Sequence, residues 1–199
     1  MASNGNAIVL EIVKVVVNDY AKRNGLVFSE AATLTRDTII GHLDSMQYIA
    51  LNAKSDEIAD VVVLIIKQSP CTYTSAPEFR KLVKKFASAT KRIVIADDTI
   101  CKSSFVQNAV ADESNCFLYP YRRFITVVPD YSLVPNHRIM SKDEVATLLA
   151  ETSRTFEDFP RILVTDPAII WIGGKRGDMI EITRISETAG VAFYYRRVL

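Results

Sequence analysis

The chain has 199 residues, a formal net charge of +1, 49% hydrophobic residues and 24% charged residues, a composition typical of a globular protein and unlike that of a disordered chain. The cysteines Cys71, Cys101 and Cys116 and the histidines His42 and His137 are spaced too widely for a disulfide framework or a structural zinc site. Because no signal peptide and no bilayer-spanning apolar run is evident, we expect a soluble, intracellular protein that needs no metal or other cofactor and no membrane.

The first helix pattern lies at the N-terminal end. Asn6 is placed to cap a helix whose apolar stripe runs from Ile8 to Tyr20, and Gly25 is placed to end it. Residues 30–54 are ambiguous, with helical character only around Thr38–Leu43.

Two β-branched runs, Asp60–Lys67 and Arg92–Ala96, predict strands that are buried on both faces. Between them, Ser75–Glu78 has the sequence of a capping box with proline in the first turn, which begins an amphipathic helix through about Ser88. The alternation of helix and strand predicts an α/β layer whose strands are joined by a right-handed crossover.

The next segment is less regular. We predict a polar loop with a short helix over residues 99–112, and short strands at Phe117–Tyr119 and Phe124–Val128. The pattern then changes, so we place a domain boundary near residue 130, with an N-terminal α/β domain at 1–130 and a small α+β domain at 131–199.

The C-terminal domain has its own start and stop signals. Ser141–Glu144 is a second capping box, and it begins a short helix over 145–151. Asp166-Pro167 caps a helix at 168–172, which Gly173-Gly174 ends. The strand patterns Met179–Arg184 and Val191–Val198 follow, joined by a polar loop that ends at Gly190.

Asp97 and Asp98 are the strongest catalytic candidates, because they follow a predicted buried strand, where α/β enzymes often place magnesium ligands. They predict, as an alternative function, a small magnesium-dependent nuclease-like or phosphotransfer enzyme. Aspartate pairs also open turns, and no further carboxylate follows the neighbouring strand. There is no P-loop and no nucleophile elbow, and we interpret His137 as a structural, hydrogen-bonding histidine.

A basic cluster is formed by Arg80, Lys81, Lys84, Lys85, Lys91 and Arg92. Four of these residues share the helix side opposite the apolar stripe, which fits either a solvated face or a surface that faces phosphates. The second interpretation leaves open a free-standing DNA-binding factor. With a net charge near zero, any contact with nucleic acid must be local and weak.

The C-terminal motifs together indicate a family. In chain order they are Leu133-Val134-Pro135-Asn136-His137, Leu148-Leu149, Phe159-Pro160-Arg161-Ile162, Asp166-Pro167, Gly173, Lys175-Arg176-Gly177, Arg184, Ser186-Glu187-Thr188-Ala189-Gly190 and Tyr195-Arg196. This segment closely resembles the assembly domain of the fifth subunit of eukaryotic nuclear RNA polymerases, which archaeal polymerases share. Gly174 differs from the apolar residue that the family usually has before Lys-Arg-Gly.

The resemblance implies a non-catalytic subunit of a multisubunit DNA-directed RNA polymerase. Its C-terminal domain is expected to dock on the largest subunit, beside other polymerase subunits. The residues implied in docking are Arg161, Asp166, Pro167, Lys175, Arg176, Gly177, Arg184, Ser186, Glu187, Thr188, Gly190, Tyr195 and Arg196. Of these, Arg161, Arg184 and Arg196 suit fork-like contacts with carboxylates or carbonyls, which either brace the domain or bind the partner.

The N-terminal domain is expected by the same resemblance to form part of the lower jaw beside downstream duplex DNA. Its DNA-proximal candidates are Thr99, Lys102, Ser103 and Ser104 with Lys81, Lys84 and Lys85. Hydroxyl groups and lysines suit phosphate contacts that read no base sequence. A divergent jaw beside a preserved assembly domain suggests a divergent polymerase or one from a large DNA virus. The expected location is therefore the nucleus, or the cytoplasm or virion for a viral enzyme.

Overall fold

The computed structural model describes residues 4–29, 33–55, 60–113, 115–186 and 190–199. The chain forms two compact units, unit 1 (Met1–Thr126) and unit 2 (Val127–Leu199). The division lies slightly before the predicted boundary at 130, because a 3-10 turn, η5 (Val128–Asp130), packs on a helix of unit 2. Among the described residues, no helix is long and apolar enough to cross a membrane.

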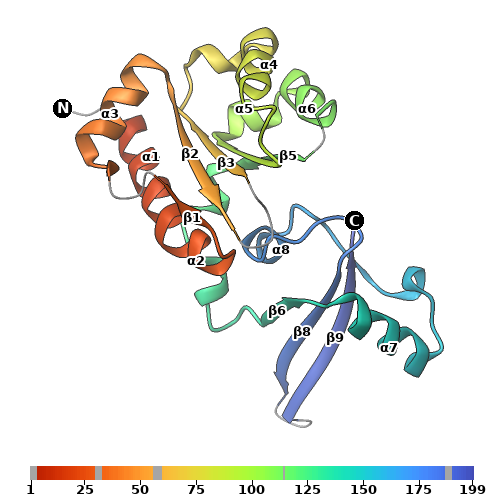
Figure 1. Ribbon diagram of the computed structural model, residues 1–199. Helices are drawn as coiled ribbons and strands as arrows, with labels where there is room; N and C mark the ends of the chain where they lie inside the picture. The colour runs from red at the N-terminus through yellow and green to blue at the C-terminus, as the bar shows by residue number, and fades with distance from the viewer. Residues whose placement is uncertain (1–3, 30–32, 56–59, 114, 187–189) are drawn as a thin grey trace. The chain divides into compact units, whose positions relative to one another are not determined.

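Unit 1 is a five-stranded mixed sheet covered by helices on both faces (Figure 1). The strands, in sheet order, are β1 (Val27–Phe28), β2 (Tyr48–Lys54), β3 (Val61–Ile66), β4 (Lys91–Ala96) and β5 (Cys116–Pro120). β1, β2 and β3 pair antiparallel, whereas β3, β4 and β5 pair parallel. The parallel pairing of β3 with β4 confirms the crossover topology, and all six residues of β3 are buried.

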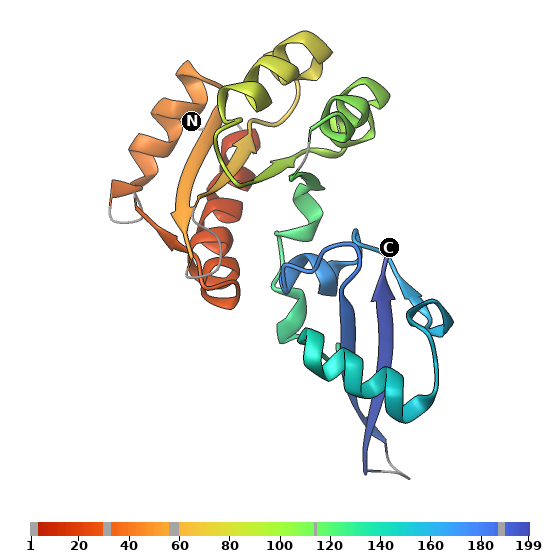
Figure 2. The same ribbon diagram turned by 45° about the vertical axis from the view of Figure 1, so that its right-hand side comes forward.

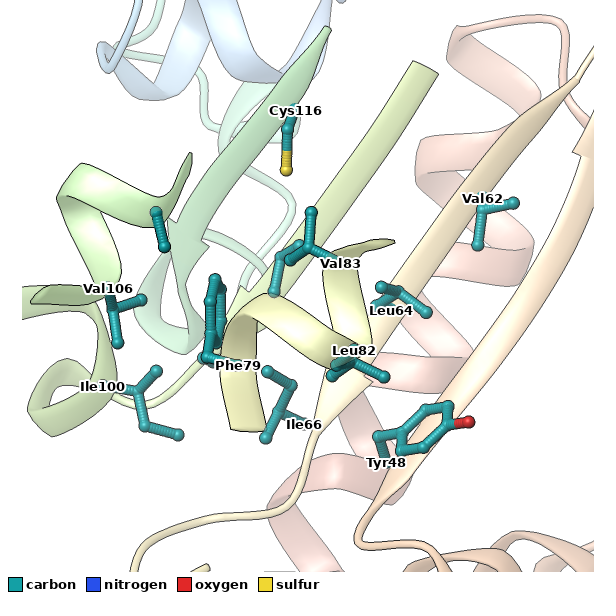
Figure 3. Packing of buried hydrophobic residues seen from close by; sticks show 13 residues of the cluster. Tyr48, Val62, Leu64, Ile66, Phe79, Leu82, Val83, Ile100, Val106 and Cys116 are labelled. Atoms are coloured by element: carbon teal, nitrogen blue, oxygen red, sulfur yellow. The ribbon is translucent and has the colours of Figure 1, made fainter. Parts of the chain in front are cut away.

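Helical segments connect and cover these strands. They are α1 (Asn4–Val15), the π-helix η1 (Val16–Tyr20), α2 (Ala21–Arg23), α3 (Arg36–Ser45), η3 (Thr72–Thr74), α4 (Ala76–Lys85), α5 (Asp98–Lys102), α6 (Ser104–Ala111) and η4 (Tyr121–Arg123). Figure 3 shows Phe79, Leu82 and Val83 of α4 packed over Leu64 and Ile66 of β3. Residues of α5 and α6 join the same core, so α4, α5 and α6 cover one face of the sheet together.

Some N-terminal predictions are wrong at the level of single elements. Asn6 lies inside α1 and is buried, so it does not cap the helix. Gly25 does have the predicted left-handed conformation, with φ of 60°. Ser75 occupies the N-cap position of α4, but its hydroxyl donates to the carbonyl of Thr72 and no side-chain cap bond forms. The strand β2, in the ambiguous region, was not predicted; its burial alternates only in its second half.

Residues 99–112 do not form a polar loop, because nearly all of them lie in α5 and α6. The apolar Ile100, Val106 and Ala109 of these helices are buried in the core. Phe117–Tyr119 lies within β5 as predicted, but Phe124–Val128 is not a strand. The chain turns through η4 instead, and Phe124 enters the core, where its ring packs 5.5 Å from the ring of Tyr20.

Unit 2 is a four-stranded sheet with the order β6-β8-β9-β7. Its strands are β6 (Asn136–Ile139), β7 (Arg161–Ile162), β8 (Met179–Ser186) and β9 (Gly190–Val198), and its helical segments besides η5 are α7 (Lys142–Thr152), η6 (Phe156–Asp158) and α8 (Pro167–Trp171). The capping box of Ser141 and Glu144 forms at the start of α7 as predicted. Asp166 caps α8 by accepting a hydrogen bond from the Ala168 amide at 2.9 Å.

The two apolar clusters of unit 2 explain why its central strands lie where they do. One cluster contains Leu148 of α7 and Met179 of β8, with Phe159 between them in sequence. The other contains Ile169 of α8 and Ile180 of β8. Because successive strand residues point to opposite faces, Met179 and Ile180 bring both faces of β8 into contact with buried side chains.

Gly174 gives a test of packing in unit 2. A Cβ atom at this position would lie 2.8 Å from Cγ2 of Ile169, a fully buried, β-branched residue. We expect Gly174→Ala to destabilise unit 2 by about 1–3 kcal/mol, because the rigid neighbour must move. Chemical unfolding followed by the fluorescence of Trp171, the single tryptophan of the chain, reports unit 2 selectively.

The matched control is Gly41→Ala, since Gly41 lies in α3 of unit 1, where the added Cβ would meet nothing within 4 Å apart from its chain neighbours and the backbone of its own helix. It should stabilise unit 1 by about 0.5–1 kcal/mol, seen by circular dichroism, through its higher helix propensity. An unchanged tryptophan transition in Gly174→Ala would contradict the close packing of Gly174 on Ile169.

Candidate functional site

The hairpin formed by β8 and β9 is longer than the strands on either side of it. The two strands pair continuously from Met179 and Arg197 to Ser186 and Gly190. β6 pairs only with residues 180–183 of β8, and β7 pairs only with the last residues of β9. The distal half of the hairpin, which comprises residues 184–186 and 190–194, therefore has no neighbouring strand among the described residues, and Figure 2 shows it extending beyond the rest of the sheet.

This distal half of the hairpin exposes apolar side chains. Ile185 is 93% exposed, and Val191 and Phe193 are 57% and 55% exposed. The register opposes Ile185 to Val191 and Thr183 to Phe193, so these side chains lie on one face. We call Ile185, Val191 and Phe193 the apolar strip. This neighbouring arrangement of exposed apolar side chains makes the strip a candidate site of interaction with another molecule.

The apolar strip continues a buried cluster of unit 2. Tyr195 lies on the same face, and its ring packs edge-on against the ring of Phe159 at 6.4 Å. α7 covers this part of the face but not the distal part. The strip is thus an uncovered extension of the core. A partner that covers it would gain a hydrophobic free energy of about 25 cal/mol for each Å² of apolar surface removed from water.

Partly exposed ion pairs connect the elements that support the hairpin. The guanidinium of Arg138 in β6 donates to the carboxylates of Glu144 in α7, at 2.7 Å, and Glu181 in β8, at 3.0 Å. The Ser141 amide and the Arg138 guanidinium lower the pKa of Glu144, and the same carboxylates raise the pKa of Arg138. These contacts connect β6, β8 and α7 at the start of the hairpin.

Part of the predicted docking set has a structural role. Asp166 caps α8, and Pro167 begins this helix. Gly177 has φ of 90°, which requires glycine, and its amide donates to the carbonyl of Val198 at 3.1 Å. Tyr195 packs in the core, and Arg196 donates from Nη1 to the carbonyl of Arg161 at 3.3 Å. These contacts are consistent with the bracing role that was left open for Arg196.

The rest of the set is exposed. Arg161, Lys175, Arg176, Arg184 and Gly190 are on the surface. The guanidinium of Arg184 lies 5.1 Å above the ring of Tyr194, a cation–π contact on the face opposite the apolar strip. The predicted Glu187 and Thr188 lie outside the described residues, and Ser186 is described only as the last residue of β8.

The prediction missed the apolar strip itself. Polar and charged motifs were selected, whereas Ile185 was assigned to the connecting loop, and Val191 and Phe193 were interpreted as ordinary strand residues. The sequence offered no direct signal, because the strip is uncovered only where the flanking strands β6 and β7 end, and neither strand was predicted. Strands of eight and nine residues, with flanking strands of four and two, must leave part of their surface uncovered.

Asp97 and Asp98 have separate, structural environments. Asp97 is the N-cap of α5, and its Oδ1 accepts a hydrogen bond from the Ile100 amide at 2.9 Å. Its Oδ2 accepts one from the Ser69 amide. Asp98 forms a 3.1 Å ion pair with the guanidinium of Arg122. In the described part of the chain, no group of three or more histidine, cysteine, aspartate or glutamate residues is arranged to hold a metal ion.

The thiols do not add a reactive site. Burial raises the pKa of Cys101 to about 12 and that of Cys116 to about 11, and it also raises the pKa of Cys71. All three therefore remain protonated at neutral pH, whereas nucleophilic or metal-binding cysteines need the thiolate. His137 is placed by a 2.7 Å hydrogen bond between Nδ1 and the carbonyl of Pro135, in agreement with its predicted structural role.

Much of the basic cluster is engaged within unit 1. Arg92 is buried and donates to Glu113 at 3.1 Å, and the ammonium group of Lys91 lies 5.4 Å from the ring centre of Phe117. These two residues are therefore not part of a solvated basic face. On α4 the remaining members are exposed: Arg80 pairs with Asp112, Lys81 pairs with Glu78, Lys85 donates to the hydroxyl of Tyr48, and Lys84 has no ion pair with a described residue.

The other DNA-proximal candidates lie on neighbouring helices. Thr99 and Lys102 are exposed in α5, Ser104 is exposed at the start of α6, and Ser103 between them is half-buried. Because α4 packs against α6 on one face of the sheet, the structure brings these residues and the lysines of α4 to the same side of unit 1.

These features define a class of protein: a two-part chain that exposes apolar side chains on a projecting hairpin, and whose catalytic candidates have structural partners. Residues 126–198 match the model of the RNA polymerase Rpb5, C-terminal domain, family. The DNA-directed RNA polymerase subunit Rpo5 of Nitrosopumilus maritimus is 48% identical over 73 residues, which is 37% of this chain and 88% of the relative. The Rpo5 subunit of Thermococcus kodakarensis is 46% identical over 70 residues, or 35% of this chain and 85% of the relative.

A third relative, the Rpo5 subunit of Methanococcoides burtonii, is 41% identical over 70 residues, or 35% of this chain and 90% of the relative. The chain therefore belongs to the family of the fifth subunit of DNA-directed RNA polymerase. The family model covers unit 2 almost completely, and it leaves all but the last residue of unit 1 unmatched.

The two aspartates provide a test between a structural and a metal-binding role. We expect Asp97→Ala to destabilise unit 1 by about 2–4 kcal/mol, because it removes both a helix cap and a hydrogen bond to a charged acceptor. Asp98→Ala, which removes only an exposed ion pair, should cost less than about 1 kcal/mol. Thermal unfolding followed by circular dichroism, with and without Mg²⁺, measures both effects, and Mg²⁺ should change neither. Magnesium-dependent stabilisation of the wild type that both variants lose would instead support the enzyme interpretation.

Proposed function

We propose that the chain is a non-catalytic subunit of a DNA-directed RNA polymerase, and that unit 2 is its assembly module. The matching segment spans between 82% and 92% of the length of these relatives, which are named polymerase subunits. A function that these proteins share with this chain must therefore reside in the shared segment. Synthesis of RNA, with its magnesium ions, belongs in this proposal to the large subunits of the enzyme.

The exposed apolar strip is the single observation that supports docking most strongly. An apolar surface that ends a well-braced sheet gains stability only when another molecule covers it. We propose the largest polymerase subunit as the main partner, as the resemblance implies. The exposed Arg161, Lys175, Arg176 and Arg184 would form the polar rim of this interface.

For unit 1 we propose the role of a jaw beside downstream duplex DNA. The supporting observation is that α4, α5 and α6 share one side of the unit and present Lys84 and Lys102 there. Arg80 and Lys81 are already paired with carboxylates, so the contact would neutralise few phosphates and would be weak. Such contacts position a duplex without reading its sequence. The nucleus, or the cytoplasm or virion of a viral system, stays the predicted location.

The jaw proposal predicts a salt effect. We consider polymerase assembled with Lys84→Gln or Lys102→Gln and its binding constant K for downstream duplex DNA. The plot of log K against log salt concentration should become less steep by about one for each lost phosphate contact. The control is Lys22→Gln, since Lys22 is exposed in α2, a helix outside the α4–α6 side of unit 1. Binding titrations between low and moderate salt give the slopes. Slopes equal to that of the control in both variants would contradict the jaw assignment.

The docking proposal predicts the effect of a charge in the apolar strip. Ile185→Asp should reduce co-purification of the other polymerase subunits with the tagged chain at least tenfold, because a carboxylate would have to be desolvated in the interface. Its own stability should change by no more than about 0.5 kcal/mol, as expected for an exposed position.

Val27→Asp is the matched control, because Val27 is also an exposed strand residue, 72% accessible, but lies in unit 1. It should leave co-purification unchanged. Equal recovery of polymerase subunits with Ile185→Asp and Val27→Asp would rule out docking through the apolar strip.

A further inference from the structure

The outer edge of β9 has an open row of backbone groups. The amides of Arg197 and Leu199 donate to the carbonyls of Pro160 and Ile162, both at 2.9 Å, on the side of β7. The amide of Val198 donates to Asp178 on the opposite side, toward β8. In an antiparallel ladder, successive residues direct their backbone groups to opposite edges of the strand. The odd-numbered residues of β9 therefore direct their N–H and C=O groups away from β8.

Three such residues, Val191, Phe193 and Tyr195, precede the part of β9 that pairs with β7, which starts at Arg197. The register places Arg161 beside Arg197, so the ladder would continue through residue 160 to the carbonyl of Tyr195. Residue 160 is proline, which has no N–H to donate, and β7 begins only after it. The outward backbone groups of these three residues have no strand partner among the described residues.

An exposed edge of this kind is a template for pairing with an extended segment. Such a segment on β9 would lie beside the apolar strip, so its side chains on the face of α7 would contact Val191 and Phe193. The charged side chains near this edge are basic. The described residues of the distal half include Arg184 but no carboxylate, and Arg161 is exposed next to the edge. The surface therefore complements a segment that alternates apolar residues and carries at least one carboxylate.

We propose that the outer edge of β9, from Val191 to Tyr195, binds an extended, partly acidic segment of another polymerase subunit as an added strand of the sheet. The inference rests on the proposed function, because it specifies how unit 2 would hold its partner. It also explains the length of the hairpin: β9 provides a longer edge than β7 can pair with.

The backbone contribution can be separated from the side chain with two variants at one position. Phe193→Pro removes the outward N–H, whereas Phe193→Thr keeps this N–H and a strand-forming side chain. We expect Phe193→Pro to bind the remaining polymerase up to about tenfold more weakly than Phe193→Thr, since one lost hydrogen bond in an interface costs up to about tenfold in affinity. Equal affinities for the two variants would overturn the proposed strand addition.

Because proline could also disturb the hairpin, amide hydrogen exchange of the wild-type chain provides the second measurement. In the free chain the amides of Val191, Phe193 and Tyr195 should exchange fast, and those of Ala192 and Tyr194, which face β8, should be protected. In the assembled polymerase the first three should slow at least tenfold.

Each outcome separates the two proposals. If the chain does not assemble with polymerase, the proposed function fails. If it assembles and the three amides exchange as in the free chain, strand addition is overturned and the proposed function stands. If the three amides are already protected in the free chain, and sedimentation shows a dimer, then a second copy of this chain occupies the edge and the proposal is equally overturned.

Discussion

The pairing of β8 with β9 is the interaction on which unit 2 depends. Its proximal half has an apolar cluster on each face, with α7 over Met179 and α8 over Ile180. The Arg138 guanidinium, which bonds to Glu144 and Glu181, joins the same strand to its neighbours. A hairpin alone is marginally stable in water, so these contacts allow the distal half to project with its apolar side chains uncovered.

The two units thus differ in which of their candidate functional side chains have structural partners and which are exposed. In unit 1 the charged candidates that face inward have structural partners: Asp97 caps a helix, and Arg92 pairs with Glu113. The groups left exposed, such as Lys84, fit a weak and non-specific contact. In unit 2 the distal half of the hairpin exposes apolar side chains that are arranged in register on a braced sheet. This difference supports our proposal that the chain assembles through unit 2.

Most of the confirmed sequence predictions depend on local signals, although the local caps at Asn6 and Ser75 did not form. The capping box at Ser141, the Asp166 cap and the run Val61–Ile66 depend on adjacent residues, and all three formed as predicted. Phe124 was misassigned because its burial depends on Tyr20, a partner far away in sequence. Similarly, the exposure of Ile185 depends on where β6 and β7 end, which no residue near Ile185 encodes. The family resemblance identified the module, but only the sheet register shows which of its side chains are uncovered.

Our central proposal is that the distal half of the β8–β9 hairpin is covered on assembly into polymerase. Hydroxyl-radical footprinting with mass spectrometry tests this most directly, because it measures the solvent exposure of individual side chains. The free chain and the chain within purified polymerase are oxidised in parallel, and the modification of Phe193 and Tyr194 is compared. Both rings are at least half exposed in the free chain, so both should be oxidised readily there, and Phe193 of the apolar strip should be strongly protected in the polymerase. Equal oxidation of Phe193 in the two samples would contradict the account.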